Sequence, residues 1–244
     1  MPLLELWRFE EPGASDDRVG QLGAGCDFEV VSGTPLSTAG KVGNAISGTD
    51  WAIKKTGDLG YIAGLQVFSC TFVYWIRRTS NTYNFGLTLK NSLDFKGFYL
   101  AESNGSGASS TAYGGGSASP SNNLSVLNTW TFRAFSWDAD TKTFKAYSDI
   151  AVPGSVLQSG TATNGSINFN NTFNTFTISG ANITLDQLMI YDEVLTPTTG
   201  TNSLDQLYNG GAGYDPTALV AASPSQGFMS RFADRNPRFQ PWRR

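Results

Sequence analysis

The chain of 244 residues contains no histidine and only two cysteines. The absence of histidine excludes Ser–His and Cys–His nucleophilic pairs and metal sites built on imidazole. Asp and Glu remain as the main acid–base groups, and calcium bound by oxygen ligands stays compatible with the composition. Cys26 and Cys70 are too few for a disulfide framework. Because Cys70 alternates with aromatic residues in a strand-like segment, we expect a buried free thiol there.

Charged residues and long apolar runs are also scarce. Only 15% of the residues are charged, and no apolar run approaches the roughly 18 residues that suggest a membrane span. The opening MPLLELWRFEEPG has neither a basic region nor a small-residue cleavage site, so no signal peptide is expected. A hydrophobic content of 40% is enough for a substantial core, in one large β domain or two small ones.

The charges that are present divide the chain into two regions. Residues 1–218 carry 12 Lys and Arg against 19 Asp and Glu, a net charge of −7. Residues 219–244 carry five Arg against one Asp, a net charge of +4. Such a division predicts two regions with different roles. The acidic region has no basic stripe, so nucleic acid is not an expected partner.

Alternation of apolar and polar residues predicts strands through most of residues 3–192. The segment FSCTFVYWIRR (68–78) is the strongest, since aromatic and β-branched residues recur along it. Further strands are expected at 3–9, 41–55, 83–102, 128–149 and 167–192, with hairpins at 83–102 and 128–149. Many short strands separated by turn signals indicate a two-sheet antiparallel sandwich.

Two segments interrupt this pattern. Residues 103–123, SNGSGASSTAYGGGSASPSNN, have low complexity and are expected to form a flexible surface loop. Later, Ser203 and Gln206 form a capping-box pattern, and Asn209-Gly210-Gly211 supplies a helix stop, which predicts one short helix near the end of the domain.

The order of the segments resembles the concanavalin A-like, laminin G-like jelly-roll family. The segments that carry the resemblance are LLELWRFEEPG, KVGNAISGTDWAIKK, FSCTFVYWIRR, TWTFRAFSWDADTKTFKAYSD and ITLDQLMIYDEVLTP followed by LDQLYNGG. Together they cover about residues 3–214. The resemblance implies an all-β jelly roll over 1–218 that closes with a short helix. Residues 219–244 are expected to form an extended C-terminal arm, on grounds given below.

The resemblance also implies sites. Many members of the family hold one structural calcium between an acid after the first strand and an Asp of the closing strand, which correspond to Glu10 and Asp186 here. Glycosidases of this fold carry E-x-D-x-x-E on one strand, and the sequence has no such run, so we expect no enzyme. Four aromatic residues are carbohydrate-binding candidates, with core packing or loop anchoring as the alternative: Trp51, Tyr61, Tyr83 and Tyr113. Four tryptophans in strong strands are expected in the core: Trp7, Trp75, Trp130 and Trp137.

The region after residue 218 lies outside the resemblance. It alternates aromatic and arginine residues, which are typical anchors of protein interfaces. We interpret it as a docking arm rather than a disordered overhang, because disordered tails normally lack aromatics. The expected docking residues are Phe228, Arg231, Phe232, Arg235, Arg238, Phe239 and Trp242.

These features together suggest a non-enzymatic, lectin-like structural protein of a virion. It would decorate a capsid or tail by docking its arm on a capsid protein, another virion protein or a neighbouring copy in a homo-oligomer, and it would contact cell-surface glycans. One alternative is a free-standing carbohydrate-binding module or adhesin, extracellular or at a cell surface. Another is a glycan-cleaving enzyme.

Overall fold

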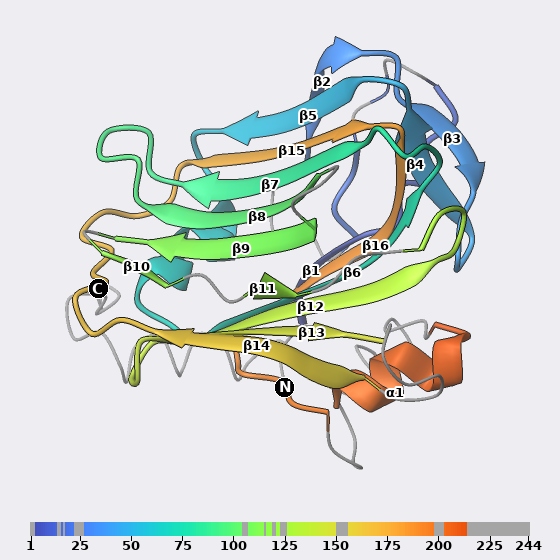
Figure 1. Cartoon of the computed structure of the whole chain (residues 1–244). Coiled ribbons are helices and arrows are strands. Elements are labelled where there is room, and N and C mark those ends of the chain that lie inside the picture. The colour runs from blue at the N-terminus through green and yellow to red at the C-terminus, as the bar shows by residue number, and fades with distance from the viewer. Residues whose placement is uncertain are drawn as a thin grey trace, which may run out of the picture.

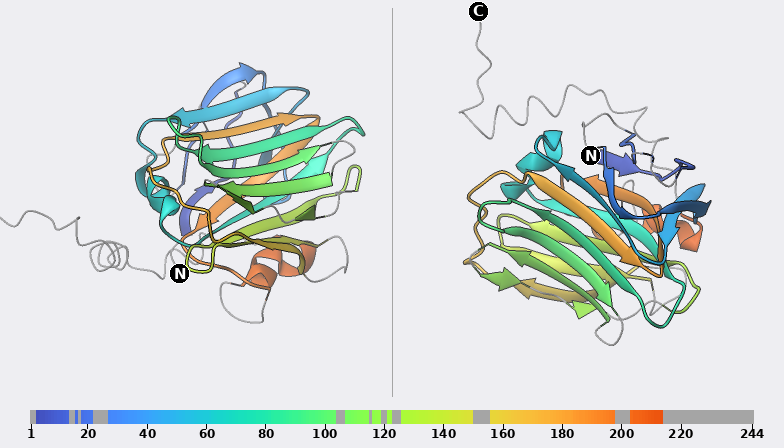
Figure 2. Two further views of the ribbon diagram at one scale, coloured as in Figure 1. Left: turned by 60° about the vertical axis from the view of Figure 1, so that its left-hand side comes forward. Right: turned by 90° about the horizontal axis from the view of Figure 1, so that it is seen from above.

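The structure is a computed structural model, and it describes residues 3–13, 16, 18–21, 27–103, 107–114, 116–118, 121–122, 126–149, 156–197 and 203–213. These residues form two antiparallel sheets stacked face to face, as the sequence predicted (Figures 1 and 2). Within the described residues no helix has the length and apolar character needed to cross a bilayer.

The first sheet, named sheet I here, has eight strands and contains the first and last strands of the domain. Its main order is β14-β13-β12-β6-β16-β4-β3, and β1 pairs with β16 beside β4. The strands are β1 (Leu3–Trp7), β3 (Leu36–Ala39), β4 (Asn44–Gly48), β6 (Cys70–Arg78), β12 (Thr131–Asp138), β13 (Thr143–Ser148), β14 (Leu157–Thr163) and β16 (Ile183–Tyr191).

Sheet II, the second sheet, also has eight strands, in the order β10-β9-β8-β7-β15-β5-β2, with β11 paired to β9. Its strands are β2 (Glu29–Gly33), β5 (Trp51–Thr56), β7 (Asn84–Lys90), β8 (Gly97–Ser103), β9 (Gly107–Tyr113), β10 (Ser117–Ala118), β11 (Ser121–Asn122) and β15 (Thr175–Ala181). Three short helical segments complete the fold: η1 (Gly60–Gln66), α1 (Leu204–Tyr208) and η2 (Asn209–Gly211).

Aromatic side chains fill the space between the sheets. Phe72 of sheet I lies with its ring centroid 5.4 Å from that of Phe98 of sheet II, and Phe98 also contacts Trp137 at 6.0 Å. The expected core residues Trp7, Trp75 and Trp137 are buried, whereas Trp130 is partly exposed. Cys70 is a buried free thiol, as predicted, and Cys26 lies outside the described residues.

A second, smaller apolar cluster covers the outer face of sheet I. Ser203 caps α1 by accepting a hydrogen bond from the backbone N–H of Gln206 at 3.2 Å, which confirms Ser203 as the N-cap of the predicted helix. The helix then places Tyr208 against Trp75 and Phe132, with centroids 5.8 Å and 5.7 Å apart. The short helix therefore covers an apolar sheet face that would otherwise meet water.

The structure corrects the sequence analysis at two segments. Within residues 103–123, which were expected to form a flexible loop, β9 pairs along its whole length with β8. Its small Ser, Thr and Ala residues give little hydrophobic signal, although the backbone pairs normally. Residues 167–171, expected to be a strand, have no strand pairing, although Ile167 and Phe169 are buried. The domain boundary at residue 218 lies outside the described residues and stays a prediction.

Candidate functional site

The outer face of sheet II carries two neighbouring tyrosines. In β8, Phe98 and Leu100 are buried in the core, so the partly exposed Tyr99 between them points outward. In β9, Ala112 is buried and Tyr113 is 45% exposed. Strand alternation therefore places Tyr99 and Tyr113 on the same outer face, and we name this pair the tyrosine platform.

The register of β8 and β9 brings the two rings of the tyrosine platform together. Tyr99 lies opposite Thr111 and Tyr113 lies opposite Gly97, so the tyrosines are diagonal neighbours. Such diagonal pairs are roughly 7–8 Å apart, within reach of aromatic side chains. Burial raises the pKa of Tyr99, and the nearby Tyr113 and Asp94 raise it further. This electrostatic coupling agrees with the proximity of the two rings.

Hydroxyl groups surround the tyrosine platform. Thr88 of β7 lies opposite Tyr99 of β8, and Thr177 of β15 lies opposite Thr88. By strand alternation, β7, β8 and β15 direct one charged side chain, Lys90, to this outer face. The next strand, β5, adds Lys54 opposite Thr177. A surface with rings and hydroxyls can bind a neutral polyol by stacking and hydrogen bonding.

Only some of the aromatic residues expected to bind carbohydrate are accessible. Trp51 and Tyr83 are 0% and 4% exposed, so the prediction that they contact a glycan is wrong. Trp51 lies in the core, and Tyr83 packs beneath the guanidinium of Arg78, 5.1 Å from its ring centroid. Tyr61 is 44% exposed but belongs to η1, which is not part of sheet II.

Sequence reasoning missed Tyr99. The alternation of DFKGFYLAE contained the necessary signal, because it sets Tyr99 out of phase with Phe98 and Leu100. Tyr99 has a neighbouring aromatic ring only because β9 pairs with β8. The sequence predicts a loop at 103–123, so this pairing is not expected from it. The expected docking residues between 219 and 244 lie outside the described residues.

A second polar site joins the closing strand to the turn before β4. Asp186 is completely buried, and its Oδ2 accepts hydrogen bonds from the backbone N–H groups of Lys41 at 2.6 Å and Val42 at 2.8 Å. Burial raises the pKa of Asp186 to about 7 despite these bonds, and the charge of Glu10 raises it as well. Glu10 Oε1 accepts a bond from the backbone N–H of Asn44 at 3.2 Å. Both carboxylates thus hold the same turn.

The residues expected to bind calcium therefore lie close together, and their donor set partly suits that ion. Asp186 Oδ1 is buried without a hydrogen-bond partner among the described residues, and a cation would satisfy it. The described part of the chain contains no group of three or more acids that could hold a metal. Backbone carbonyls or water would have to complete a calcium shell here.

A third charged site crosses the interior between the sheets. Arg133 of β12 donates from Nε to Glu102 Oε1 of β8 at 2.7 Å, and both side chains are fully buried. Burial and the charge of Glu102 raise the pKa of Tyr74 beside this pair, while Arg133 lowers it. Since Glu102 is enclosed and paired, it has no route to a substrate.

The buried carboxylates also bear on the enzyme alternative. Asp186, with its raised pKa, and the adjacent Glu10 have the electrostatic character of an acid–base pair in a glycosidase. However, Asp186 is 0% exposed and one of its oxygens is engaged by two backbone N–H groups. A general acid must reach the bond that it protonates, so this geometry favours a structural role.

Comparison with known proteins supports the fold. No family model matches the chain, and no curated protein matches it in sequence. Among solved structures, the binding domain of botulinum neurotoxin DC in complex with SialylT is similar, with a TM-score of 0.58 and 13% identity over 87% of this chain and 52% of that one. A structure of botulinum neurotoxin type C, described as entering cells through interaction with two ganglioside molecules, gives 0.58 and 14% over 86% and 51%.

A sialidase shares the same fold. Trypanosoma rangeli sialidase in complex with 2,3-difluoro-KDN matches with a TM-score of 0.55 and 14% identity, over 87% of this chain and 33% of the sialidase. The chain therefore spans about half the length of the toxin domains and a third of the sialidase. At these identities the likeness shows a jelly-roll β-sandwich and nothing finer.

Proposed function

We propose that this domain is a non-enzymatic, lectin-like glycan-binding module and that the tyrosine platform is its binding surface. The observation that carries the proposal is the partly exposed Tyr99 beside the exposed Tyr113, among threonine hydroxyls on the outer face of sheet II. Pyranose rings present C–H faces that stack on aromatic side chains and hydroxyls that bond to Thr and Ser. The toxin domains of similar fold, whose structures refer to SialylT and gangliosides, support the same function class.

Substitution of Tyr113 tests this proposal. Tyr113→Ala removes one of the two rings, and we expect the affinity for a glycan selected on an array to fall about 5- to 30-fold, the effect of roughly 1–2 kcal/mol. The affinity is measured by calorimetry with the selected oligosaccharide.

Tyr61→Ala provides a matched control. Tyr61 is 44% exposed, nearly the same as Tyr113, but lies on η1. We expect this variant to bind the glycan as the wild type does. An equal loss in both variants, or no loss in either, would remove the tyrosine platform as the binding surface. Release of reducing sugar by the wild type would instead favour the enzyme.

We also propose that calcium binds at Asp186 and Glu10. The support is the buried Oδ1 of Asp186, which has no hydrogen-bond partner in the described part of the chain, beside a second carboxylate. A bound ion would neutralise both carboxylates and tie β16 to the segment after β1, which would stabilise the sandwich. The two oxygens that already accept backbone hydrogen bonds would keep the turn at 40–44 in place.

The arm over residues 219–244 is proposed to fix the domain to a virion, through an acidic surface of a capsid protein, another virion protein or a second copy of the chain. Its net charge of +4 and its interspersed aromatics support this partner chemistry. The free-standing carbohydrate-binding module or adhesin, at a cell surface or outside the cell, is the second candidate.

Truncation distinguishes these two candidates. A chain ending at Ala218 is expected to bind the same glycan with unchanged affinity, because the truncation removes no residue of the tyrosine platform. In purified particles from a host producing the truncated chain, we expect the protein to fall to background on quantitative immunoblots. Normal incorporation of the truncated chain would contradict a docking arm, and absence of the full chain from particles would favour the free module.

A further inference from the structure

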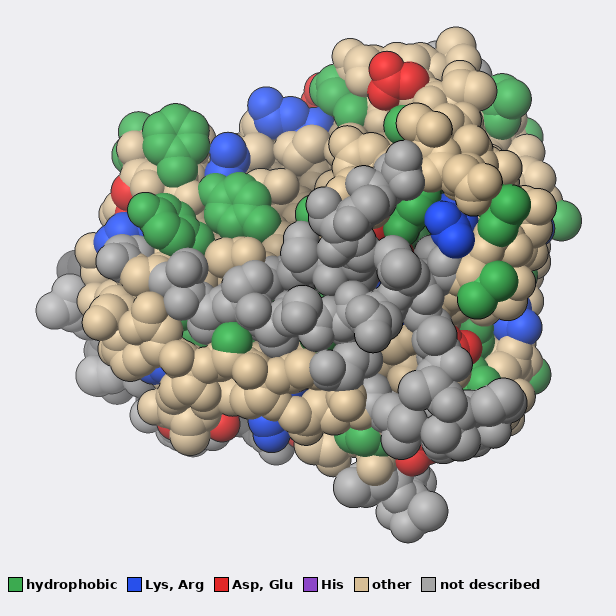
Figure 3. All heavy atoms as spheres, in the orientation of Figure 1, with side chains coloured by type: hydrophobic (Ala, Val, Ile, Leu, Met, Phe, Trp, Pro, Cys, Tyr) green, Lys and Arg blue, Asp and Glu red, His purple; other side chains and the backbone are tan. Residues whose placement is uncertain are grey.

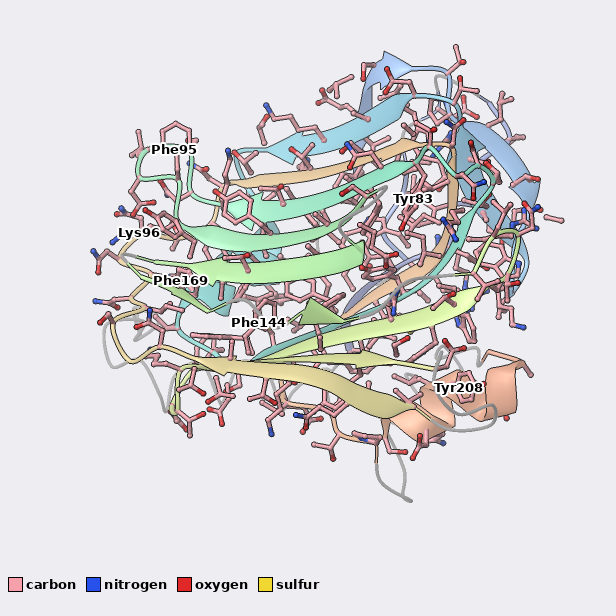
Figure 4. All side chains as sticks on the ribbon, in the orientation of Figure 1. Tyr83, Phe95, Lys96, Phe144, Phe169 and Tyr208 are labelled. Atoms are coloured by element: carbon pink, nitrogen blue, oxygen red, sulfur yellow. The ribbon has the colours of Figure 1, made fainter. Side chains whose placement is uncertain are left out.

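The turn between β7 and β8 displays the two most exposed large hydrophobic side chains of the described residues. Leu93 is 82% exposed and Phe95 is 59% exposed. The turn, residues 91–96, projects beyond the neighbouring strands of sheet II (Figure 1). Figure 4 shows Phe95 at this tip beside Lys96, and Figure 3 shows hydrophobic and basic side chains gathered at the same corner. We name residues 91–96 the hydrophobic tip.

Hydrogen bonds hold the hydrophobic tip in one conformation. Asn91 Oδ1 accepts from the backbone N–H of Leu93 at 2.8 Å, and Asp94 Oδ1 accepts from that of Lys96 at 3.1 Å. A loop on the other side contributes too, since Asn174 Oδ1 accepts from the backbone N–H of Ser92 at 2.9 Å. The exposure of the apolar side chains is therefore built into a rigid turn, which lowers the entropy cost of binding.

The backbone conformation of Phe95 indicates that a phenylalanine at this position does not serve to stabilise the turn. Its φ is 57°, in the left-handed region that favours Gly or Asn and is unfavourable for a bulky side chain. Tyr99 Oη donates to the Phe95 carbonyl at 2.5 Å and helps to hold this conformation. The turn thus maintains a strained backbone that points an aromatic ring toward solvent.

The charges at the hydrophobic tip indicate the kind of surface that it meets. Lys90 Nζ lies 4.9 Å from the centroid of the Phe95 ring, and Lys96 follows Phe95 directly. The one acid of the tip, Asp94, has both oxygens engaged, by the N–H of Lys96 and by Asn171 Nδ2 at 2.9 Å. The tip therefore combines two apolar side chains with Lys96 and the adjacent Lys90 of β7, on a region whose overall charge is negative.

A convex tip of this size suits a lipid surface better than a protein or a sugar. A stable protein partner generally buries about 800 Å² on each side, more than two side chains offer. A glycan stacks on rings, which leaves the most exposed residue, Leu93, without a role. An anionic headgroup layer attracts lysines and accepts apolar side chains at its acyl boundary without a shaped pocket. We infer that the hydrophobic tip inserts Leu93 and Phe95 into the interface of an anionic lipid bilayer.

Vesicle co-sedimentation with the full chain tests this inference. The vesicles are pure phosphatidylcholine, or phosphatidylcholine with phosphatidylserine. We expect binding to the anionic vesicles alone, weakened by salt, and a fall of the partition coefficient by at least about tenfold in Leu93→Ser/Phe95→Ser. Lys90→Gln is expected to lower it about fivefold. The matched control, Leu36→Ser/Val126→Ser, changes two side chains that are 56% and 57% exposed elsewhere and should bind as the wild type does.

A fluorescent probe separates insertion of the tip from attraction of the basic arm. Leu93→Cys in a Cys26→Ser background is labelled with the environment-sensitive dye NBD; Cys70 is fully buried, so its thiol does not react. We expect a blue shift on anionic vesicles and quenching by lipids with nitroxide on the acyl chain. Val126→Cys in the same background should give neither.

Three results would overturn the inference. The first is an absence of vesicle binding. The second is binding that the tip variants leave unchanged while the Leu93→Cys probe stays silent, which would assign binding to residues 219–244. The third is an oligomer, detected by light scattering, that the tip variants dissociate, which would assign the tip to self-association. Loss of glycan binding in Tyr113→Ala is a separate readout, so failure of the tip leaves the proposed glycan function standing.

Discussion

Glu102→Ala is expected to lower the free energy of unfolding by about 3–5 kcal/mol, because it removes one partner of a fully buried ion pair with Arg133. The loss is large beside the roughly 5–15 kcal/mol that stabilises a typical folded domain. Urea denaturation followed by tryptophan fluorescence measures it, since the midpoint should fall while the slope stays constant.

The double variant Glu102→Leu/Arg133→Met shows whether charge or packing causes the loss. It removes both charges and fills the space with apolar atoms, so we expect stability near or above that of the wild type. Glu29→Ala, on an exposed edge strand of the same sheet, should change stability by less than about 0.5 kcal/mol. A loss of less than about 1 kcal/mol in Glu102→Ala would mean that Arg133 finds water or another partner.

Asp186 is expected to make the domain less stable as the pH rises from about 4 to about 7 in the presence of EDTA. Its pKa is about 7 in the folded protein against 3.8 for an ordinary Asp, so the folded state binds the proton more tightly. The contribution of Asp186 to stability is complete below its pKa in the unfolded chain. It is lost as the pH rises through its pKa in the folded protein. A shift of this size corresponds to at most about 4 kcal/mol, measured from urea midpoints across the pH range.

Asp186→Asn isolates this contribution from other titrating groups. The amide resembles the protonated acid, so the difference between variant and wild type should be near zero at about pH 4 and should favour the variant at about pH 8. A constant difference across the range would contradict the raised pKa. Millimolar calcium at the higher pH tests the proposed metal site, because it should raise the melting temperature of the wild type but not of Asp186→Asn.

The sequence predicted the main layers of the fold because the central strands have strong patterns. β6, the β7–β8 and β12–β13 hairpins and the capped helix appeared where alternation, turn residues and capping residues indicated them. Six strands had no such signal. β2 and β3 are edge strands with no buried side chain, and β9, β10, β11 and β14 are rich in small polar residues. Their pairing depends on backbone hydrogen bonds to neighbours, which residue types alone do not reveal.

The candidate site was less accessible to prediction. The family resemblance predicted that Glu10 and Asp186 lie close together. In the structure both carboxylates accept hydrogen bonds from the backbone of the same turn before β4. Aromatic residues are harder to assign to the core or the surface. Side chains in a strand alternate between the two faces of the sheet, so a shift of one residue in the expected strand moves a Trp or Tyr from one face to the other. Trp51, a carbohydrate-binding candidate with core packing as the alternative, is in the core. Tyr99 gained its role only through β9.

The pairing of β1 with β16 determines how the domain responds to tension. Leu3, at the start of β1, lies opposite Tyr191, at the end of β16, so a force that separates these two points opens the ladder from one end. Hydrogen bonds would then break in sequence, as in unzipping, instead of sharing the load as in shear. A pull applied beyond α1 would first peel Tyr208 from Trp75 and Phe132. The domain is thus mechanically weak when it is pulled between the start of β1 and the end of β16.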